Sequence, residues 1–128
     1  MDINALSEAE AREMLELMEL EAKMVAENKL ADYKPYKKQM EFHRAGGDDG
    51  VRERLLMAGN QLGKTVAGSF EAAMHLTGIY PDWWDGVRFR DATSGWAASI
   101  TAQGTRDTVQ RLLLGPPGNW GTGAIPKA

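Results

Sequence analysis

The sequence predicts an α/β fold in which an incomplete parallel sheet is flanked by helices and preceded by a long acidic helix. Three features support this prediction: an acidic amphipathic pattern at the N-terminus, a short apolar run at residues 53–58, and Ala-rich helical spacing from Thr65 to about Leu76. Alternating strands and helices place a parallel sheet between helical layers. We divide the chain into a helical arm, residues 1–33, and an α/β region, residues 34–128.

The N-terminal arm has the pattern of one long amphipathic helix. Ser7 and Glu10 have the spacing of a capping box, and the helix is expected to end near Tyr33 and Pro35. Apolar side chains recur along one face at helical spacing: Met14, Leu17, Met18, Met24 and Val25. We interpret this face as packing on the chain's own domain, and docking on a partner is the alternative.

A shorter helix is expected next, with Pro35 at its start and a Gly-rich loop, residues 46–50, at its end. Gln39 and Phe42 fall on one side of this helix. A carboxamide can donate to and accept from the edge of adenine, and Tyr36 or Phe42 could stack on the base. The alternative is a solvent-exposed Gln39 and a Phe42 that belongs to the core.

Residues 58–65 read Ala-Gly-Asn-Gln-Leu-Gly-Lys-Thr, which is the phosphate-binding (P-loop, or Walker A) pattern with Ala58 in place of its first glycine. The predicted strand before it and the predicted helix after it supply the context that this motif requires. Such a junction leaves backbone N–H groups unpaired at the positive end of the helix dipole, which makes an anion site. The sequence therefore predicts that this loop binds the polyphosphate of a nucleotide.

The residue types in the loop match that chemistry. Lys64 is the candidate catalytic residue because its ammonium can reach the β and γ phosphates, and Thr65 can offer its hydroxyl to Mg²⁺. Gly63 lets the backbone approach the phosphates closely. The cofactors expected are therefore ATP and Mg²⁺. The candidate cofactor-binding residues are Gln39, Ala58, Gly59, Asn60, Gln61, Leu62, Gly63, Lys64 and Thr65.

The rest of the sequence predicts further alternation of strands and helices. We expect strands at residues 87–89 and 95–100, a helix at residues 105–114, and an irregular Gly/Pro-rich end. A sheet that lacks part of its strands exposes edges and apolar faces. We therefore expect the isolated chain to be marginally stable or to self-associate.

Composition excludes several classes of protein. The 128 residues are 43% hydrophobic with a formal net charge of -3, which is an ordinary globular composition. No apolar stretch is long enough for a membrane helix, and the acidic N-terminus does not match a secretory signal, so we expect no membrane partner. The absence of cysteine excludes disulfides and thiolate metal sites, and we interpret the separated His43 and His75 as surface or helix-packing residues.

Six stretches, together with the acidic leading helix, resemble one family over most of the chain: residues 35–42, 57–65, 75–78, 80–84, 106–114 and 115–118. That family is the large terminase subunits of tailed double-stranded DNA bacteriophages, and the likeness is closest to its headful-packaging group. The resemblance implies that residues 34–128 are the N-terminal part of a P-loop ATPase domain, with Gln39 on adenine, Lys64 on phosphate and Thr65 on magnesium. It also implies double-stranded DNA, the small terminase subunit and the portal protein as partners, in the host cell cytoplasm.

Two features depart from that family. Many members carry an arginine within the phosphate loop, where this chain has Asn60, so the catalytic arginine is expected elsewhere. The candidates are Arg52, Arg54, Arg106 and Arg111, or a residue of a neighbouring subunit. Hydrolysis also needs an apolar strand that ends in acidic residues, and no apolar run after Thr65 ends that way. We therefore expect the N-terminal portion of a terminase, without its nuclease domain and with negligible hydrolysis of its own.

The leading hypothesis for function is the ATP-binding portion of a viral DNA-packaging motor that couples ATP hydrolysis to DNA translocation. One alternative is a small nucleotide or metabolite kinase that uses the same loop, although the sequence offers no candidate for a lid or an acceptor site. The other alternative is a noncatalytic adaptor that acts through its acidic helix.

Overall fold

The computed structural model describes residues 7–59, 61 and 63–127, and this part of the chain is helical. The elements are, in chain order, α1 (Glu8–Glu27), α2 (Lys29–Asp32), α3 (Lys37–Ala45), α4 (Lys64–Thr77), α5 (Ala102–Gly104), the π-helix η2 (Thr105–Gln110) and α6 (Arg111–Leu114). The predicted α/β fold is wrong for these residues, because no strand and no sheet form among them. Their β-type pairing is limited to an isolated bridge between Thr122 and Pro126.

The N-terminal helix α1 confirms the predicted capping box. The Ser7 backbone N–H donates to Glu10 Oε2 (2.9 Å), and the Glu10 N–H donates to Ser7 Oγ (3.4 Å). The helix ends at Asn28, whose N–H bonds to the Val25 carbonyl, and the short α2 follows. The predicted continuous helix to Tyr33 is therefore broken in two.

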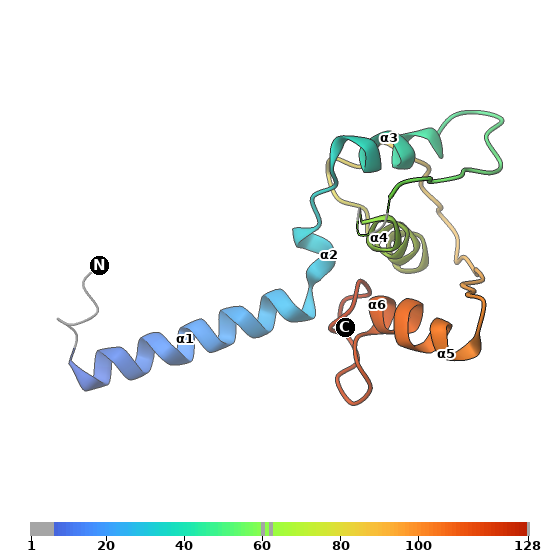
Figure 1. Ribbon diagram of the computed structural model, residues 1–128. Helices are drawn as coiled ribbons and strands as arrows, with labels where there is room; N and C mark the ends of the chain where they lie inside the picture. Colours follow the sequence, from blue (N-terminus) through green and yellow to red (C-terminus); the bar gives the residue numbers. More distant parts are fainter. Residues whose placement is uncertain (1–6, 60, 62, 128) are drawn as a thin grey trace.

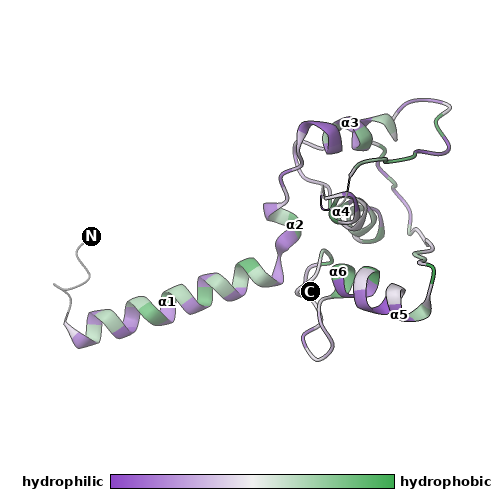
Figure 2. Cartoon of the chain, in the orientation of Figure 1, coloured by the Kyte–Doolittle hydropathy of each residue, from purple (hydrophilic) through white to green (hydrophobic). Residues whose placement is uncertain are grey.

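The prediction that the apolar face of α1 packs on its own domain is also wrong. The helix extends away from the other elements (Figure 1), and none of its residues is buried within the described structure. Hydrophobic and hydrophilic residues alternate along its exposed surface (Figure 2). Most of its large apolar side chains, such as Leu17 and Met24, are more than half exposed, whereas Met14 is partly buried.

Helix α4 is the centre of the remaining structure. It lies between α3 and α6 (Figure 1), and it also contacts α2. Glycines in the left-handed region cap both ends, Gly63 at φ 75° and Gly78 at φ 72°. The buried face of α4 includes Ala67 and Ala73, whose small side chains let neighbouring segments approach closely.

A compact aromatic cluster joins α2, α4 and the loop after α4. Its buried members are Leu30, Tyr33, Met74 and Trp84, and the partly buried Phe70, Tyr80 and Trp83 pack against them. The rings of Tyr33 and Phe70 stack with centroids 4.2 Å apart. Burial of several aromatic side chains supplies much of the apolar area that leaves water on folding.

The three segments predicted as strands, residues 53–58, 87–89 and 95–100, have no regular secondary structure in the described residues. A strand is stable only when a neighbour pairs with its N–H and C=O groups, and these segments do not pair with one another. Leu55 is 81% exposed and Met57 is 80% exposed, so the apolar run before the loop is not a buried strand here.

The predicted helix at residues 105–114 is confirmed, with its first part wound as the π-helix η2. The Gly/Pro-rich end then folds back onto α6: the N–H groups of Gly121, Ala124 and Ile125 donate to the carbonyls of the last residues of α6, at 2.7–2.9 Å. These bonds satisfy carbonyls that a helix end leaves unpaired. Lys127 also reaches the C-terminal end of α1, where its Nζ lies 3.0 Å from Glu27 Oε1.

None of the described helices is both long and apolar enough to cross a membrane.

Gly123 is required by the fold-back of the C-terminal loop, because a Cβ at this position would lie 2.5 Å from the Leu113 carbonyl. We expect Gly123→Ala to lower the free energy of unfolding by about 1–3 kcal/mol, measured by urea denaturation. Gly68 in α4 has nothing within 4 Å of an added Cβ, so Gly68→Ala should raise stability by roughly 0.5–1 kcal/mol. Equal effects of the two substitutions would contradict the packing of this loop.

Candidate nucleotide-binding site

The Gly-Lys-Thr triplet begins a helix, as the sequence predicts. Gly63 is the N-cap of α4 in the left-handed conformation, and α4 continues for 14 residues from Lys64. Gln61 also has a positive φ, 60°, so the chain turns sharply just before the helix. The first N–H groups of α4 have no partners within the helix, and they lie at the positive end of its dipole. The described residues thus place Lys64 and Thr65 at a helix N-terminus, where an anion is favoured, although the segment before it is not a strand.

The Lys64 ammonium folds back over the loop that precedes it. Its Nζ donates to the carbonyl oxygens of Ala58 and, at 3.1 Å, of Gly59. The positive charge therefore lies among the candidate loop residues, and its acceptors in the described part of the loop are neutral carbonyls. Of the other predicted loop residues, Thr65 is the exposed second residue of α4, and Asn60 and Leu62 lie outside the described residues.

Gln39, on α3, is brought directly against this loop from 24 residues upstream. Its Nε2 donates to the Gly63 carbonyl (3.0 Å), and its Oε1 accepts from the Tyr36 N–H (2.8 Å). The side chain is 5% exposed, which corrects the alternative of a solvent-exposed Gln39. A Cβ on Gly63 would lie 2.6 Å from Gln39 Nε2, so glycine is needed for this contact as well as for its backbone conformation.

A pocket of about 460 Å³ opens beside this contact. Its lining residues come from the α2–α3 connection, α3, the loop and the first turn of α4: Tyr33, Lys34, Tyr36, Gln39, Gln61, Gly63 and Val66. Tyr36 is 74% exposed and is available for stacking. Phe42, the other predicted stacking residue, instead packs under Arg54, whose Cζ lies 4.5 Å from the ring centroid. Of the two predicted stacking residues, Tyr36 therefore lines this pocket and Phe42 does not.

A buried ionic cluster lies behind the site, and sequence reasoning missed it. Its hub is Glu71 of α4, whose carboxylate oxygens are 2.6 Å from His43 Nδ1 and 3.3 Å from His75 Nε2, and both terminal nitrogens of Arg54 bond to it. An ionised carboxylate only accepts, so His43 carries its proton on Nδ1, and its Nε2 accepts from the Tyr33 hydroxyl at 2.9 Å. His43 is fully buried, as a helix-packing residue with a polar role.

The cluster changes the titration of its members. Burial alone would raise the pKa of Glu71, but hydrogen bonds from His43, His75 and Arg54 outweigh it and hold this pKa well below its usual range. Burial, and secondarily the negative charge of Glu71, raises the pKa of the Tyr33 hydroxyl. The spacing of Glu71 and His75, four residues apart on an apolar helix, is the signal that could have pointed to this cluster.

The arginines proposed as catalytic candidates differ in their surroundings. Arg54 is held by Glu71 and by the Phe42 carbonyl, and Arg106 pairs with Asp107 on the surface. Arg111 lines a separate pocket between α4 and α6. Arg54 therefore has a structural role in this arrangement, and the source of a catalytic arginine stays a prediction.

The described residues contain no group of three His, Asp or Glu side chains placed to hold a metal ion. The role of the Thr65 hydroxyl toward Mg²⁺ stays a prediction.

Comparison with known proteins gives the class of protein. A family model for the N-terminal part of the large terminase subunit, T4likevirus-type, matches residues 55–128. The large terminase subunit of Salmonella phage P22 is 39% identical over 140 residues, which cover 98% of this chain and 28% of the P22 protein. No solved structure matches this chain.

The chain belongs to the large terminase subunit family, and the resemblance in its sequence is confirmed at that level. It corresponds to the N-terminal region of these phage packaging proteins, and it spans little more than a quarter of the length of the P22 relative.

The buried carboxylate of Glu71 should control stability in acid. Its lowered pKa means that its stabilisation is present above the ordinary value of 4.5 and is lost as the pH falls below it toward the folded-state pKa. We expect Glu71→Gln to cost about 3–5 kcal/mol near pH 7, because Arg54 is left unpaired, and to cost progressively less below pH 4.5.

Urea unfolding of both proteins from pH 7 to pH 3 measures this dependence. Glu41→Gln is the matched control, because Glu41 pairs only with Lys38 on the surface of α3. A Glu71→Gln cost that does not change with pH would contradict an ionised carboxylate at the centre of the cluster.

Proposed function

We propose that this chain is the ATP-binding portion of a viral DNA-packaging motor. The observation that carries the proposal is the contact between Gln39 and Gly63, which joins an upstream helix to the glycine-capped start of α4 beside an open pocket. The family membership of the chain supports a packaging role.

The triphosphate of ATP binds at the N-terminus of α4. Backbone N–H groups at Lys64 and Thr65 and the helix dipole attract the anion, as at other helix N-termini. The Lys64 ammonium exchanges the neutral carbonyls of Ala58 and Gly59 for phosphate oxygens, which are stronger acceptors because they are charged. Thr65 offers its hydroxyl to the Mg²⁺ ion that accompanies the phosphates.

Adenine binds in the pocket beside the loop. Tyr36 stacks on the base, and Gln39 reads its edge. The amide of Gln39 uses one N–H for Gly63 and one lone pair for Tyr36, so one donor and one acceptor position remain for the base. Gln39 would then link base recognition to the position of the phosphate loop.

The intact protein couples ATP hydrolysis to movement of double-stranded DNA into a procapsid, in the host cell cytoplasm, with the small terminase subunit and the portal protein as partners. These functions are proposed from the family alone. Hydrolysis requires carboxylates that hold Mg²⁺ and orient water, and the described residues bring no such cluster together. We therefore propose binding without appreciable turnover for this chain by itself.

Lys64 gives the most direct test of phosphate binding. We expect Lys64→Ala to reduce affinity for Mg-ATP by about 100-fold, because a charge-assisted interaction with two phosphates is lost. Isothermal titration calorimetry measures this loss, and Lys23→Ala on the projecting helix is the control that removes the same charge elsewhere. Unchanged affinity in Lys64→Ala would contradict the site.

Gln39 separates base recognition from phosphate binding. We expect Gln39→Ala to weaken ATP about tenfold more than it weakens inorganic triphosphate, since only ATP loses a base contact. Both ligands are measured by the same titration, and Gln103→Ala on α5 is the matched control. Equal losses for the two ligands would leave Gln39 as a support for Gly63 and remove its role on adenine.

A further inference from the structure

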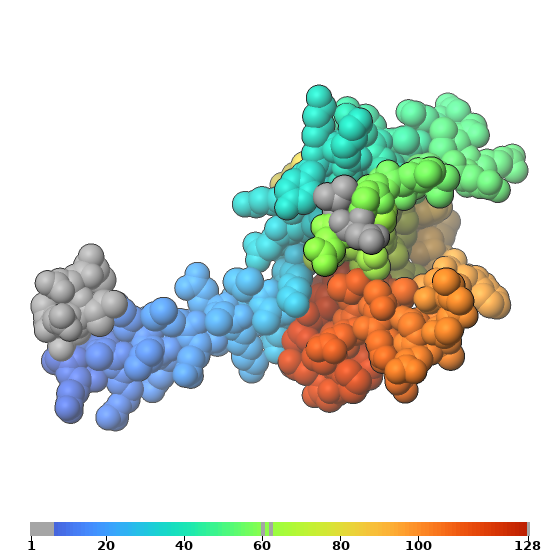
Figure 3. All heavy atoms as spheres, in the orientation of Figure 1, coloured from blue at the N-terminus to red at the C-terminus, as the bar shows by residue number. Residues whose placement is uncertain are grey.

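The long helix α1 presents an apolar stripe that is largely exposed: within the described structure Met14 is partly buried and Met24 lines a shallow pocket, and the side chains between them are exposed. The stripe consists of Met14, Leu17, Met18, Met24 and Val25, with Glu21 on the same face because it lies one turn from both Leu17 and Val25. The 20 residues of α1 extend roughly 30 Å, and Figure 3 shows this helix projecting from the rest of the molecule. It can therefore reach a neighbouring molecule.

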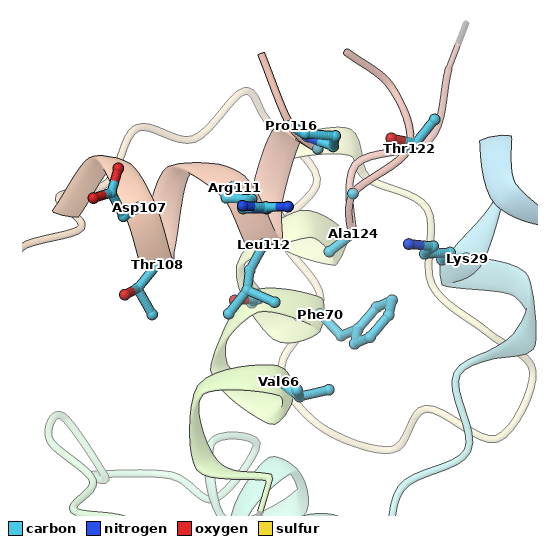
Figure 4. A pocket seen from close by; sticks show the side chains of 13 residues that line it. Lys29, Val66, Phe70, Asp107, Thr108, Arg111, Leu112, Pro116, Thr122 and Ala124 are labelled. Carbon is cyan, nitrogen blue, oxygen red and sulfur yellow. The ribbon is translucent and has the colours of Figure 1, made fainter. Parts of the chain in front are cut away.

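A pocket of about 520 Å³ between α4 and α6 is also apolar in part, but it carries positive rather than negative charge. Its apolar wall includes Val66 and Phe70 of α4, Leu112 of α6 and Ala124 of the C-terminal loop. Lys29 of α2 and Arg111 of α6 project toward each other from its two sides (Figure 4).

Neither Lys29 nor Arg111 forms an ion pair with any residue that the structure describes. The acidic residue in the lining, Asp107, pairs with Arg106. Two like charges that face each other over an apolar surface favour a ligand that carries a carboxylate on an apolar body.

We propose that the Glu21-centred stripe of α1 docks into the Lys29–Arg111 pocket of a second copy of this chain. The stripe supplies a carboxylate flanked by methionine and leucine, which matches two cations flanking an apolar wall. In its own molecule α1 points away from the other elements (Figure 1). A different surface on each copy makes the contact, so it is a head-to-tail contact that forms rings or open chains.

A symmetric pair of α1 helices is the less favourable arrangement. Each helix carries seven glutamates against two basic residues, Arg12 and Lys23, so two such helices side by side repel each other. Docking into the cationic pocket removes that repulsion. The contact goes beyond the nucleotide site and does not depend on it.

Analytical ultracentrifugation of the full chain over a wide concentration range tests the proposal. Wild type should self-associate, and more weakly when salt rises from about 50 to about 500 mM. Glu21→Lys, and separately the double substitution Lys29→Glu with Arg111→Glu, should each raise the dissociation constant about tenfold or more. Glu19→Lys is the matched control on the opposite face of α1 and should leave association unchanged.

The most discriminating experiment mixes the Glu21→Lys protein with the protein that carries Lys29→Glu and Arg111→Glu. Each should be largely monomeric alone, and an equimolar mixture should associate, because each then meets a complementary charge on the other. Circular dichroism checks that α1 stays helical in every variant. A wild type that stays monomeric, equal effects of Glu19→Lys and Glu21→Lys, or a mixture that fails to associate would each overturn the proposal.

Discussion

The position of the candidate loop depends on one buried carboxylate. Glu71 lies seven residues after Lys64 on α4, and Arg54 lies four residues before Ala58, so their ion pair ties together the segments on either side of the loop. The same arginine also donates to the Phe42 carbonyl on α3 (2.7 Å). The described residues form no sheet, so this cluster, rather than strand pairing, fixes the relative positions of the segments on either side of the loop. A buried charge without its partner is costly, so conformations that separate Glu71 from Arg54 are strongly disfavoured.

The ionic cluster around Glu71 and the candidate site are connected through helix α3. His43 and Gln39 both belong to α3, four residues apart: His43 contacts Glu71, and Gln39 contacts Gly63. Helix α3 is thus fixed to α4 at two points along its length. This places the pocket lined by Tyr36 directly beside the candidate loop, on elements that these two contacts join.

Local features were predictable from the sequence, and nonlocal ones were not. The capping box of Ser7, the helix start at Lys64 and the helix near residues 105–114 depend on short-range patterns, and all three are present. The strand at residues 53–58 was inferred from an apolar run alone, but a strand also needs a pairing partner, which periodicity does not reveal. The contact between Glu71 and His75, four residues apart, follows from helical spacing, whereas the contacts of Glu71 with Arg54 and His43 join residues 17 and 28 positions apart, for which a single sequence contains no signal.

The central claim is that the N-terminus of α4 binds the phosphates of a nucleotide, while Gln39 fixes the loop through its hydrogen bond to Gly63. Backbone amide chemical shifts recorded during a titration with Mg-ATP test it most directly. The predicted result is saturable shifts concentrated at Gly63, Lys64 and Thr65, with the side-chain amide of Gln39 shifting in parallel. The contradictory result is no shift at these amides at saturating ATP, or shifts confined to the pocket around Lys29 and Arg111.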